Sequence, residues 1–255
     1  MSGEPVIRAA LVTGGTGSIG GGVVRSLTAA NLQVAFSGRS EERGTALEAA
    51  TGARFLAADA ADRDACDRCF SRAVDHLGRI DLFVSCTGIV FVSPLEDTEL
   101  AVFREVVEVN LTSVFRYSRA AFQHMKSHGG GSIVHVVSDA ALRGLHHIPA
   151  YSTAKAGLLA VSELLAAEGA SHGIRVNAIC PGATRPGVQA TLKGFEHHAE
   201  NASSWGPALS GRHGEPGDIA KAVLWLASHD ACHISGATVR IDGAAGVAMW
   251  GRAHA

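Results

Sequence analysis

The chain alternates short apolar runs with longer stretches of helical periodicity along almost its whole length. This alternation is typical of repeated strand–helix–strand units, because two parallel strands need a crossover connection long enough to hold a helix. The apolar runs are rich in Val, Ile and Leu without strict alternation, as expected for strands buried on both faces. The sequence therefore predicts an α/β fold, a doubly wound domain with a mostly parallel sheet of about seven strands.

The strand pattern occurs in residues 9–13, 33–37, 53–57, 82–85, 132–137, 175–179 and 238–241. The helical pattern occurs in residues 20–30, 64–77, 98–128, 150–172 and 216–228. No internal repeat or linker divides the chain, so residues 1–255 are predicted to form one domain. The least regular stretch, residues 182–214, follows a strand and is expected to form a lid over a site.

Charge and hydropathy narrow the classes of partner. The formal net charge is only -2, with acidic and basic residues interspersed, so no basic stripe is present to bind a nucleic acid. The N-terminal residues lack the charged start and long apolar stretch of a signal peptide, and no apolar run reaches the roughly 18 residues of a membrane helix. We therefore expect a cytoplasmic protein with neither a nucleic-acid nor a membrane partner.

The five cysteines are odd in number and scattered, which argues against a disulfide framework. Cys66 and Cys69 form a CxxC, but they lie within a predicted helix rather than before one. No second Cys or His pair stands at zinc-ligand spacing. Both cysteines are therefore expected to pack in the core, and no metal site is predicted.

The segment after the first predicted strand is rich in glycine and leads at once into a helical pattern. Glycines let the backbone approach a pyrophosphate closely, and the helix N-terminus offers it free N–H groups and a positive dipole end. This context predicts a Rossmann-type dinucleotide site. Its residues are Gly14, Thr16, Gly17, Ser18, Ile19 and Gly20.

The end of the second predicted strand bears on the choice of dinucleotide. An NAD-preferring site usually carries an acidic side chain there, which accepts hydrogen bonds from the adenosine ribose. Here the chain has Arg39 and Ser40 instead. Because a guanidinium pairs well with a 2'-phosphate, the sequence favours NADP(H), and NAD(H) stays open as the alternative.

Ser138, Tyr151 and Lys155 form a second motif. Ser138 follows a predicted strand, and Tyr151 and Lys155 lie four apart on one face of the next predicted helix. A nearby ammonium favours a phenolate, so Lys155 is expected to lower the pKa of Tyr151 from its usual value near 10. Tyr151 is thereby predicted to act as a general acid or base.

Together with the glycine-rich start, this order resembles the short-chain dehydrogenase/reductase family in its compact, single-domain type. The resemblance covers residues 6–243 and includes Asp59, Asn110, Pro181-Gly182 and Ile241-Asp242-Gly243. It implies an NAD(P)-dependent carbonyl reductase, which transfers a hydride between a nicotinamide and a ketone or secondary alcohol. It also implies a homotetramer or homodimer, packed through the helices at 98–128 and 150–172.

The resemblance implies a role for each active-site residue. Ser138 is expected to orient the substrate carbonyl, Tyr151 to donate the proton in reduction and Lys155 to bind the nicotinamide ribose. Asn110 is expected to hold a proton-relay water. Further cofactor contacts are expected from Asp59, Ala60, Thr87, Gly88, Tyr151, Lys155, Pro181, Gly182 and Thr184.

The expected substrate wall includes Ala140, Leu142 and Arg143, next to Ser138 and Tyr151. Arg143 either receives a carboxylate or phosphate or, as we favour, points to solvent. A mid-sized ketone or secondary alcohol suits such a wall. Two alternatives stay open: reduction of a 3-oxoacyl thioester carried by acyl carrier protein or coenzyme A, and a non-catalytic NADP(H)-binding sensor.

Some positions depart from the family pattern. Ser18 stands where compact members usually have a cofactor glycine. The segment from Ser85 to Gly88 replaces an Asn-Asn-Ala-Gly motif, so the hydrogen bonds of its first asparagine must come from Ser85 or elsewhere. Pro186 replaces a threonine that contacts the nicotinamide, and Thr184 is the expected substitute.

Overall fold

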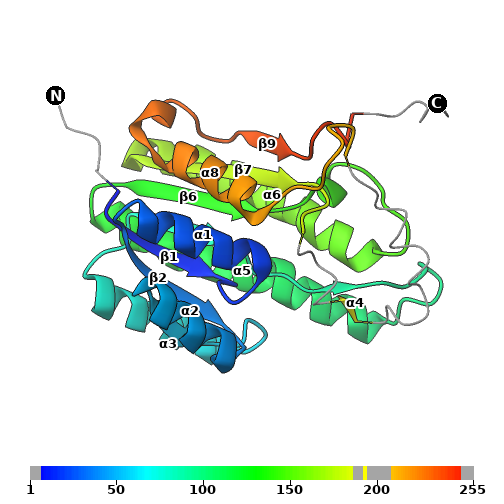
Figure 1. Ribbon diagram of the computed structural model, residues 1–255, viewed down its shortest axis with the longest axis horizontal. Coiled ribbons are helices and arrows are strands. Elements are labelled where there is room, and N and C mark those ends of the chain that lie inside the picture. Colours follow the sequence, from blue (N-terminus) through cyan, green and yellow to red (C-terminus); the bar gives the residue numbers. More distant parts are fainter. Residues whose placement is uncertain (1–6, 186–191, 194–207, 248–255) are drawn as a thin grey trace.

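The computed structural model describes residues 7–185, 192–193 and 208–247. Its main sheet has seven strands in the order β3-β2-β1-β4-β6-β7-β9, and every neighbouring pair is parallel. In Figure 1 the strands run in one direction, so their carboxyl ends meet at one edge. The strands are β1 (Ala9–Thr13), β2 (Gln33–Gly38), β3 (Arg54–Ala57), β4 (Leu82–Ser85), β6 (Gly131–Val136), β7 (Ile174–Pro181) and β9 (Thr238–Ile241).

Helices cover both faces of this sheet (Figure 1). On one face, α1 (Ser18–Ala29), α2 (Glu41–Thr51) and α8 (Pro216–Ala227) pack in one apolar cluster. On the other, α3 (Arg63–Leu77), α5 (Ser113–Ser127) and α6 (Pro149–Gly169) pack in a second cluster. The predicted doubly wound α/β fold is confirmed, and the predicted strands lie within two residues of the observed ones.

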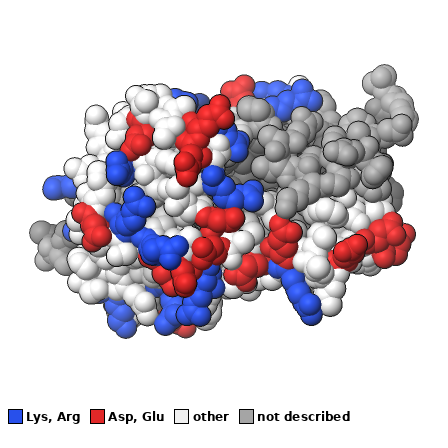
Figure 2. Space-filling view, turned by 90° about the horizontal axis from the view of Figure 1, so that it is seen from below, with Lys and Arg blue, Asp and Glu red and all other residues white. Residues whose placement is uncertain are grey.

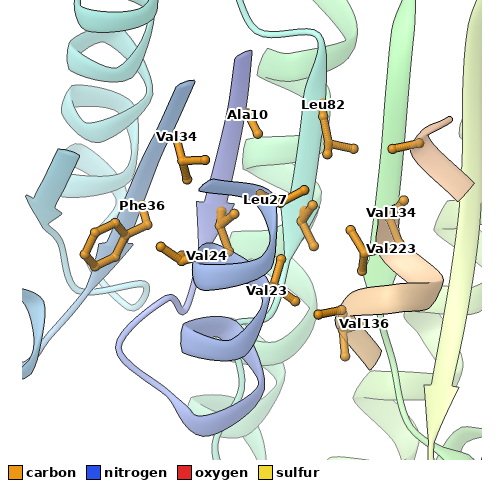
Figure 3. Packing of buried hydrophobic residues seen from close by; sticks show 14 of the residues in the cluster. Ala10, Val23, Val24, Leu27, Val34, Phe36, Leu82, Val134, Val136 and Val223 are labelled. Carbon is orange, nitrogen blue, oxygen red and sulfur yellow. The ribbon is translucent and has the colours of Figure 1, made fainter. Parts of the chain in front are cut away.

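The packing of α1 fixes the start of the glycine-rich turn relative to the sheet. Val23, Val24 and Leu27 are fully buried on one face of this helix, where they meet side chains of β1, β2, β4, β6 and α8 (Figure 3). Each such side chain contributes about 1.5–3 kcal/mol by leaving water. The N-terminus of α1 is therefore held rigidly at the carboxyl end of β1.

Three elements differ from the sequence prediction. The helix α2 was not predicted because only Gly44 and Leu47 of it are buried, which leaves a weak periodicity. The predicted helix at 98–128 consists of α4 (Leu100–Val107), a π-helical turn at Glu108–Thr112 and α5. A small parallel pair, β5 (Val90–Phe91) with β8 (Leu192–Lys193), also lies outside the main sheet.

Acidic and basic side chains are mixed on the face shown in Figure 2. This agrees with the interspersed charges of the sequence. Among the described helices, none combines the length and apolar character needed to span a membrane.

His135 is a fully buried titratable residue in the middle of β6. Its ring nitrogens lie 2.8 Å from Ser118 Oγ and 2.7 Å from Ser162 Oγ. Burial and, to a smaller extent, the charge of Lys155 lower the pKa of His135 to about 3. The native state therefore holds His135 neutral.

We expect this histidine to weaken the fold in acid. Between about pH 6.5 and pH 3 the unfolded chain binds a proton at His135 that the native state excludes, so stability falls as the pH falls, by up to about 1.4 kcal/mol per pH unit. His135→Gln should reduce this slope, whereas His233→Gln, at an exposed position, should not. Urea unfolding at several pH values measures it, and an unchanged slope in His135→Gln would contradict the assignment.

Candidate active site

The glycine-rich turn joins β1 to the N-terminus of α1. Gly14 has φ +71°, a conformation that favours glycine, and its position leaves no room for a side chain against the backbone of Cys86 and Thr87. The turn is closed by hydrogen bonds from Gly15 N to Ser37 O (2.7 Å) and from Gly17 N to Gly14 O (3.0 Å). These contacts hold the turn between β2 and β4, on either side of β1.

The N-terminus of α1 suits an anionic ligand. Gly17 is the N-cap residue, so no side chain caps the first N–H groups, and no acidic residue lies in the first turn. The Ser18 hydroxyl is buried without a hydrogen-bond partner in the described part of the chain. Free N–H groups and an orphaned hydroxyl at a helix N-terminus are what a pyrophosphate would satisfy, so these residues fit the expected dinucleotide.

The residues expected around the adenosine lie at the ends of β2 and β3. Arg39 is exposed immediately after β2. Ser40 is the N-cap of α2, and its Oγ accepts a hydrogen bond from Arg43 N at 3.3 Å. Asp59 is exposed after β3, and its Oδ1 accepts from Ala61 N at 3.0 Å, next to Ala60. Of this group, Arg39 is the exposed residue that carries a positive charge.

Asn110 lies in the π-helical turn between α4 and α5 and is fully buried. Its amide exchanges hydrogen bonds with the backbone of Ile89 in both directions (3.2 and 2.9 Å) and donates a third to Val106 O (2.8 Å). A Cβ at Gly88 would lie 2.7 Å from Asn110 Oδ1 and 3.5 Å from Lys155 Nζ. The structure thus brings Asn110 and Lys155 together beside Gly88.

Ser138 follows β6 and precedes a single 3₁₀ turn at Asp139–Ala141. Its Oγ accepts a hydrogen bond from Ala140 N at 3.2 Å. Tyr151 lies in the first turn of α6, and burial raises the pKa of its phenol to about 12, while a hydrogen bond from the Ser138 side chain lowers it. The charge of Asp139 and the Cys180 thiol raise the pKa of Tyr151 as well.

Lys155 is almost fully buried, one turn beyond Tyr151 on α6. Its ammonium donates to Val136 O at 3.1 Å and to Thr87 O at 3.3 Å, and lies 5.8 Å from the centre of the Tyr151 ring. Burial lowers the pKa of Lys155 to about 8. These bonds attach the helix that carries Tyr151 to the ends of β6 and β4.

The expected tuning of Tyr151 by Lys155 is wrong for this structure. The pKa of Tyr151 is raised, not lowered, because burial outweighs the other effects and the Lys155 ammonium is held on two carbonyl groups. A second expectation concerned Ser85 as a source of structural hydrogen bonds. Its Oγ is buried without a partner in the described residues, so Ser85 does not replace the missing asparagine.

Arg143 is an exposed residue, as the sequence analysis favoured, but its guanidinium is also engaged within the chain. Its guanidinium donates to Asp139 Oδ2 at 2.7 Å and to Ala245 O at 3.1 Å. Ala140 is buried, and Leu142 packs against a small apolar cluster that includes Val137 and Leu158. The Arg143 guanidinium is therefore already engaged, and no local sequence pattern predicts this contact because Ala245 lies far along the chain.

The segment after β7 returns to the sheet edge. Pro181 ends β7, and Gly182 N donates to Ile241 O at 3.1 Å, with no space for a side chain at Gly182 against Asp242. Thr184 Oγ1 donates to Gly182 O at 3.0 Å. The carbonyl of Gly214 accepts from Arg185 N at 2.8 Å, so the two ends of the expected lid are joined.

Pro186 and most of the expected lid lie outside the described residues. The strand β8, which belongs to that segment, pairs with β5 just after Gly88. Part of the segment 182–214 therefore lies beside the active-site residues.

Cys66 and Cys69 are buried free thiols that pack in the second apolar cluster. Burial raises the pKa of both thiols. The structure therefore confirms the expectation that both cysteines pack in the core.

Comparison with known proteins gives concordant matches over nearly the whole chain. Residues 14–245 match the family model described as enoyl-(acyl carrier protein) reductase. An acetoacetyl-CoA reductase of Rhizobium meliloti is 35% identical over 92% of this chain and 97% of its own length. A 3beta-hydroxysteroid dehydrogenase 1 of Eggerthella lenta is 32% identical over 91% of each chain. The crystal structure of levodione reductase superposes with a TM-score of 0.87 at 30% identity, covering 94% of this chain and 98% of the other.

Proposed function

The chain belongs to the short-chain dehydrogenase/reductase family, and we propose that it transfers a hydride between a nicotinamide dinucleotide and a ketone or secondary alcohol at Tyr151. The observation that carries this proposal is the convergence of Ser138, Tyr151 and Lys155 beside the glycine-rich turn. The Ser138 side chain acts on the pKa of Tyr151, Lys155 Nζ lies 5.8 Å from the centre of the Tyr151 ring, and Lys155 binds Thr87 O in the segment that also contacts Gly14. Proton-transfer groups and the dinucleotide cradle therefore occupy one edge of the sheet.

The residues of this chain account for the proton half of the reaction. In reduction, the Ser138 hydroxyl and the Tyr151 phenol hold the substrate oxygen, and the phenol gives up its proton as charge develops there. A phenol whose pKa is about 12 is protonated at neutral pH and ready to donate. When bound, the reduced nicotinamide supplies the hydride. In the opposite direction Tyr151 must first lose its proton, so alcohol oxidation is favoured at higher pH.

The same residues would hold the dinucleotide. The N–H groups at the start of α1 and the Ser18 hydroxyl would hold the pyrophosphate, and Lys155 would hold the nicotinamide ribose. Further contacts are proposed for Asp59, Thr87 and Thr184. Asn110 is proposed to hold the relay water through the π-helical turn that its hydrogen bonds stabilise.

We infer a preference for NADP(H) from Arg39. Its exposed guanidinium follows β2, at the edge where the adenosine ribose is expected. Arg39→Leu should weaken NADPH binding about 10- to 100-fold, the value of a charge-assisted hydrogen-bond pair, and leave NADH binding unchanged. Arg43→Leu, at the next exposed arginine on α2, is the matched control. Fluorescence titration measures both affinities, and an equal loss for the two cofactors would refute the assignment.

A second candidate is the reduction of a 3-oxoacyl thioester. It is favoured by the relative from Rhizobium meliloti, which is named an acetoacetyl-CoA reductase. The third candidate is a non-catalytic sensor, and the position of Ser138 and Lys155 next to Tyr151 argues against it.

A substrate panel separates these functions. Purified protein with NADPH is mixed with cyclic ketones, 3-oxoacyl thioesters and enoyl thioesters, and the loss of reduced-nicotinamide absorbance is followed. Turnover of ketones supports the first function, and turnover restricted to 3-oxoacyl thioesters supports the second. Cofactor binding without any turnover, with alcohols and the oxidised cofactors included, would favour the sensor.

We also propose that residues 1–255 act as one domain within a homo-oligomer. Phe115 on α5 and Leu164 on α6 are exposed large apolar side chains, on the two helices expected to pack against a second copy. An obligate interface of this kind would remove both side chains from water. Light scattering of the purified protein measures the oligomeric state.

A further inference from the structure

Asp139 connects the proposed active site to the C-terminal part of the chain. It directly follows Ser138, and its side chain is only 14% exposed. One oxygen, Oδ1, lies 3.4 Å from Ser138 Oγ, while Oδ2 accepts from Arg143 Nη2 at 2.7 Å. The carboxylate therefore lies between the Ser138 hydroxyl and a guanidinium.

Arg143 is held at both ends. Its Nη2 binds Asp139 and its Nη1 donates to Ala245 O at 3.1 Å. The turn that carries Ala245 is closed by Asp242, whose Oδ1 accepts from Ala244 N (3.0 Å) and whose Oδ2 accepts from Gly246 N (2.8 Å). The geometry of the Asp139–Arg143 pair is thus fixed by residues from two distant parts of the chain.

The Ser138 hydroxyl has one proton and two acceptors within reach. One lone pair of Ser138 Oγ is already used by Ala140 N. Its proton can go to Asp139 Oδ1 or to the oxygen of Tyr151. A hydrogen bond to the phenolate stabilises that form, and a carboxylate nearby disfavours it by like-charge repulsion.

We propose that Asp139, with its charge balanced by Arg143, is a positioning residue that competes with Tyr151 for the Ser138 proton and so sets the pH range of alcohol oxidation. The proposal rests on the hydride-transfer function proposed above. Among the residues that the structure describes, the other titratable or charged groups that face Tyr151 are Lys155, on its own helix, and the Cys180 thiol of β7. Both side chains are kept in the Asp139 and Arg143 variants, although the charge of Asp139 also raises the pKa of the Cys180 thiol.

Substitutions of Asp139 and of Arg143 are expected to shift the pH profile of alcohol oxidation in opposite directions. Asp139→Asn keeps the shape but removes the negative charge, so the rise of kcat/KM for alcohol oxidation should move to lower pH by about one unit. Arg143→Met leaves the carboxylate unbalanced, and the same rise should move to higher pH. Arg143→Lys, which restores a positive charge, should move it back toward the wild-type position. Glu48→Gln on α2, which breaks an ion pair with Arg54 of β3, is the control and should leave the profile unchanged.

A second readout does not depend on turnover. The chain has two tyrosines, Tyr117 and Tyr151, so in a Tyr117→Phe background the tyrosinate absorbance reports Tyr151 alone. Measured just after a rapid pH jump, before the protein unfolds, its midpoint should fall in Asp139→Asn and rise in Arg143→Met. Shifts in opposite directions support the proposal. The proposal is overturned if the tyrosinate midpoints shift in the same direction in both variants. It is also overturned if kcat or thermal stability falls while the midpoints stay unchanged, because the Asp139–Arg143 pair then only stabilises the fold. If no alcohol or ketone is turned over by the wild-type protein, the hydride-transfer function fails, and the tyrosinate titration still decides the role of Asp139.

Discussion

Tyr151→Phe is expected to lower kcat for ketone reduction by a factor of about 10²–10⁴, the range in which a positioned general acid contributes. Phenylalanine keeps the ring in its partly buried place beside Ala150 and Ile89 but removes the phenol next to Ser138 that supplies the proton. NADPH affinity should change by less than about tenfold, because at most one hydrogen bond is lost. Steady-state kinetics and fluorescence titration measure the two quantities.

Tyr117→Phe is the matched control for this variant. Tyr117 is the other tyrosine of the chain, buried on α5 against Phe83 and the Cys66 and Cys69 thiols. Its loss should reduce stability without reducing kcat. A large fall of kcat in Tyr117→Phe, or a normal kcat in Tyr151→Phe, would remove Tyr151 from the proton-transfer role.

The second large effect concerns two adjacent glycines of α1. A Cβ at Gly20 would overlap the carbonyl oxygen of Gly14 and lie 2.8 and 2.9 Å from Gly14 C and Gly15 Cα, all of which are backbone atoms. A Cβ at Gly21 would have only ordinary contacts, the nearest at 3.4 Å from Gly15 O. Gly20→Ala should therefore displace the turn, whereas Gly21→Ala should not.

We expect Gly20→Ala to weaken dinucleotide binding at least about 10- to 100-fold, since the displaced N–H groups are charge-assisted donors. The overpacked turn should also cost about 1–3 kcal/mol of unfolding free energy. Gly21→Ala should keep cofactor affinity and gain up to about 1 kcal/mol from the better helix propensity of alanine. Urea unfolding and fluorescence titration give both values. Equal dinucleotide affinities of Gly20→Ala and Gly21→Ala would mean that the Gly14–Gly20 turn does not bind the cofactor.

Much of the fold was predictable because buried parallel strands carry a strong local signal. The apolar runs at β1, β4 and β9 give the observed bounds from sequence alone. The break between α4 and α5 was not predicted, because the apolar period continues through the π-helical turn. The available clue was an asparagine, Asn110, within the apolar pattern of a long predicted helix. In the structure this amide is fully buried and takes backbone partners outside its own helix.

The sequence was enough to predict which residues form the candidate site, but not the direction in which the pKa of Tyr151 is shifted. The spacing of Ser138, Tyr151 and Lys155 placed them together, as the structure has them. The direction of the Tyr151 pKa shift was missed, because burial and the carbonyl partners of Lys155 depend on tertiary packing. The link from Arg143 to Ala245 joins residues more than a hundred positions apart, and no local pattern reports such a contact.

The proposed reaction is tested most directly by following the hydride itself. NADPH deuterated at the transferred position of the nicotinamide is incubated with the protein and the best ketone of the panel, and the alcohol is analysed by mass spectrometry. We expect one deuterium at the carbinol carbon of the product, with the rate of its appearance reduced about 10²–10⁴-fold in Tyr151→Phe. Product alcohol without deuterium, or bound cofactor that never transfers it to any ketone or 3-oxoacyl thioester, would contradict a hydride-transfer function for this chain.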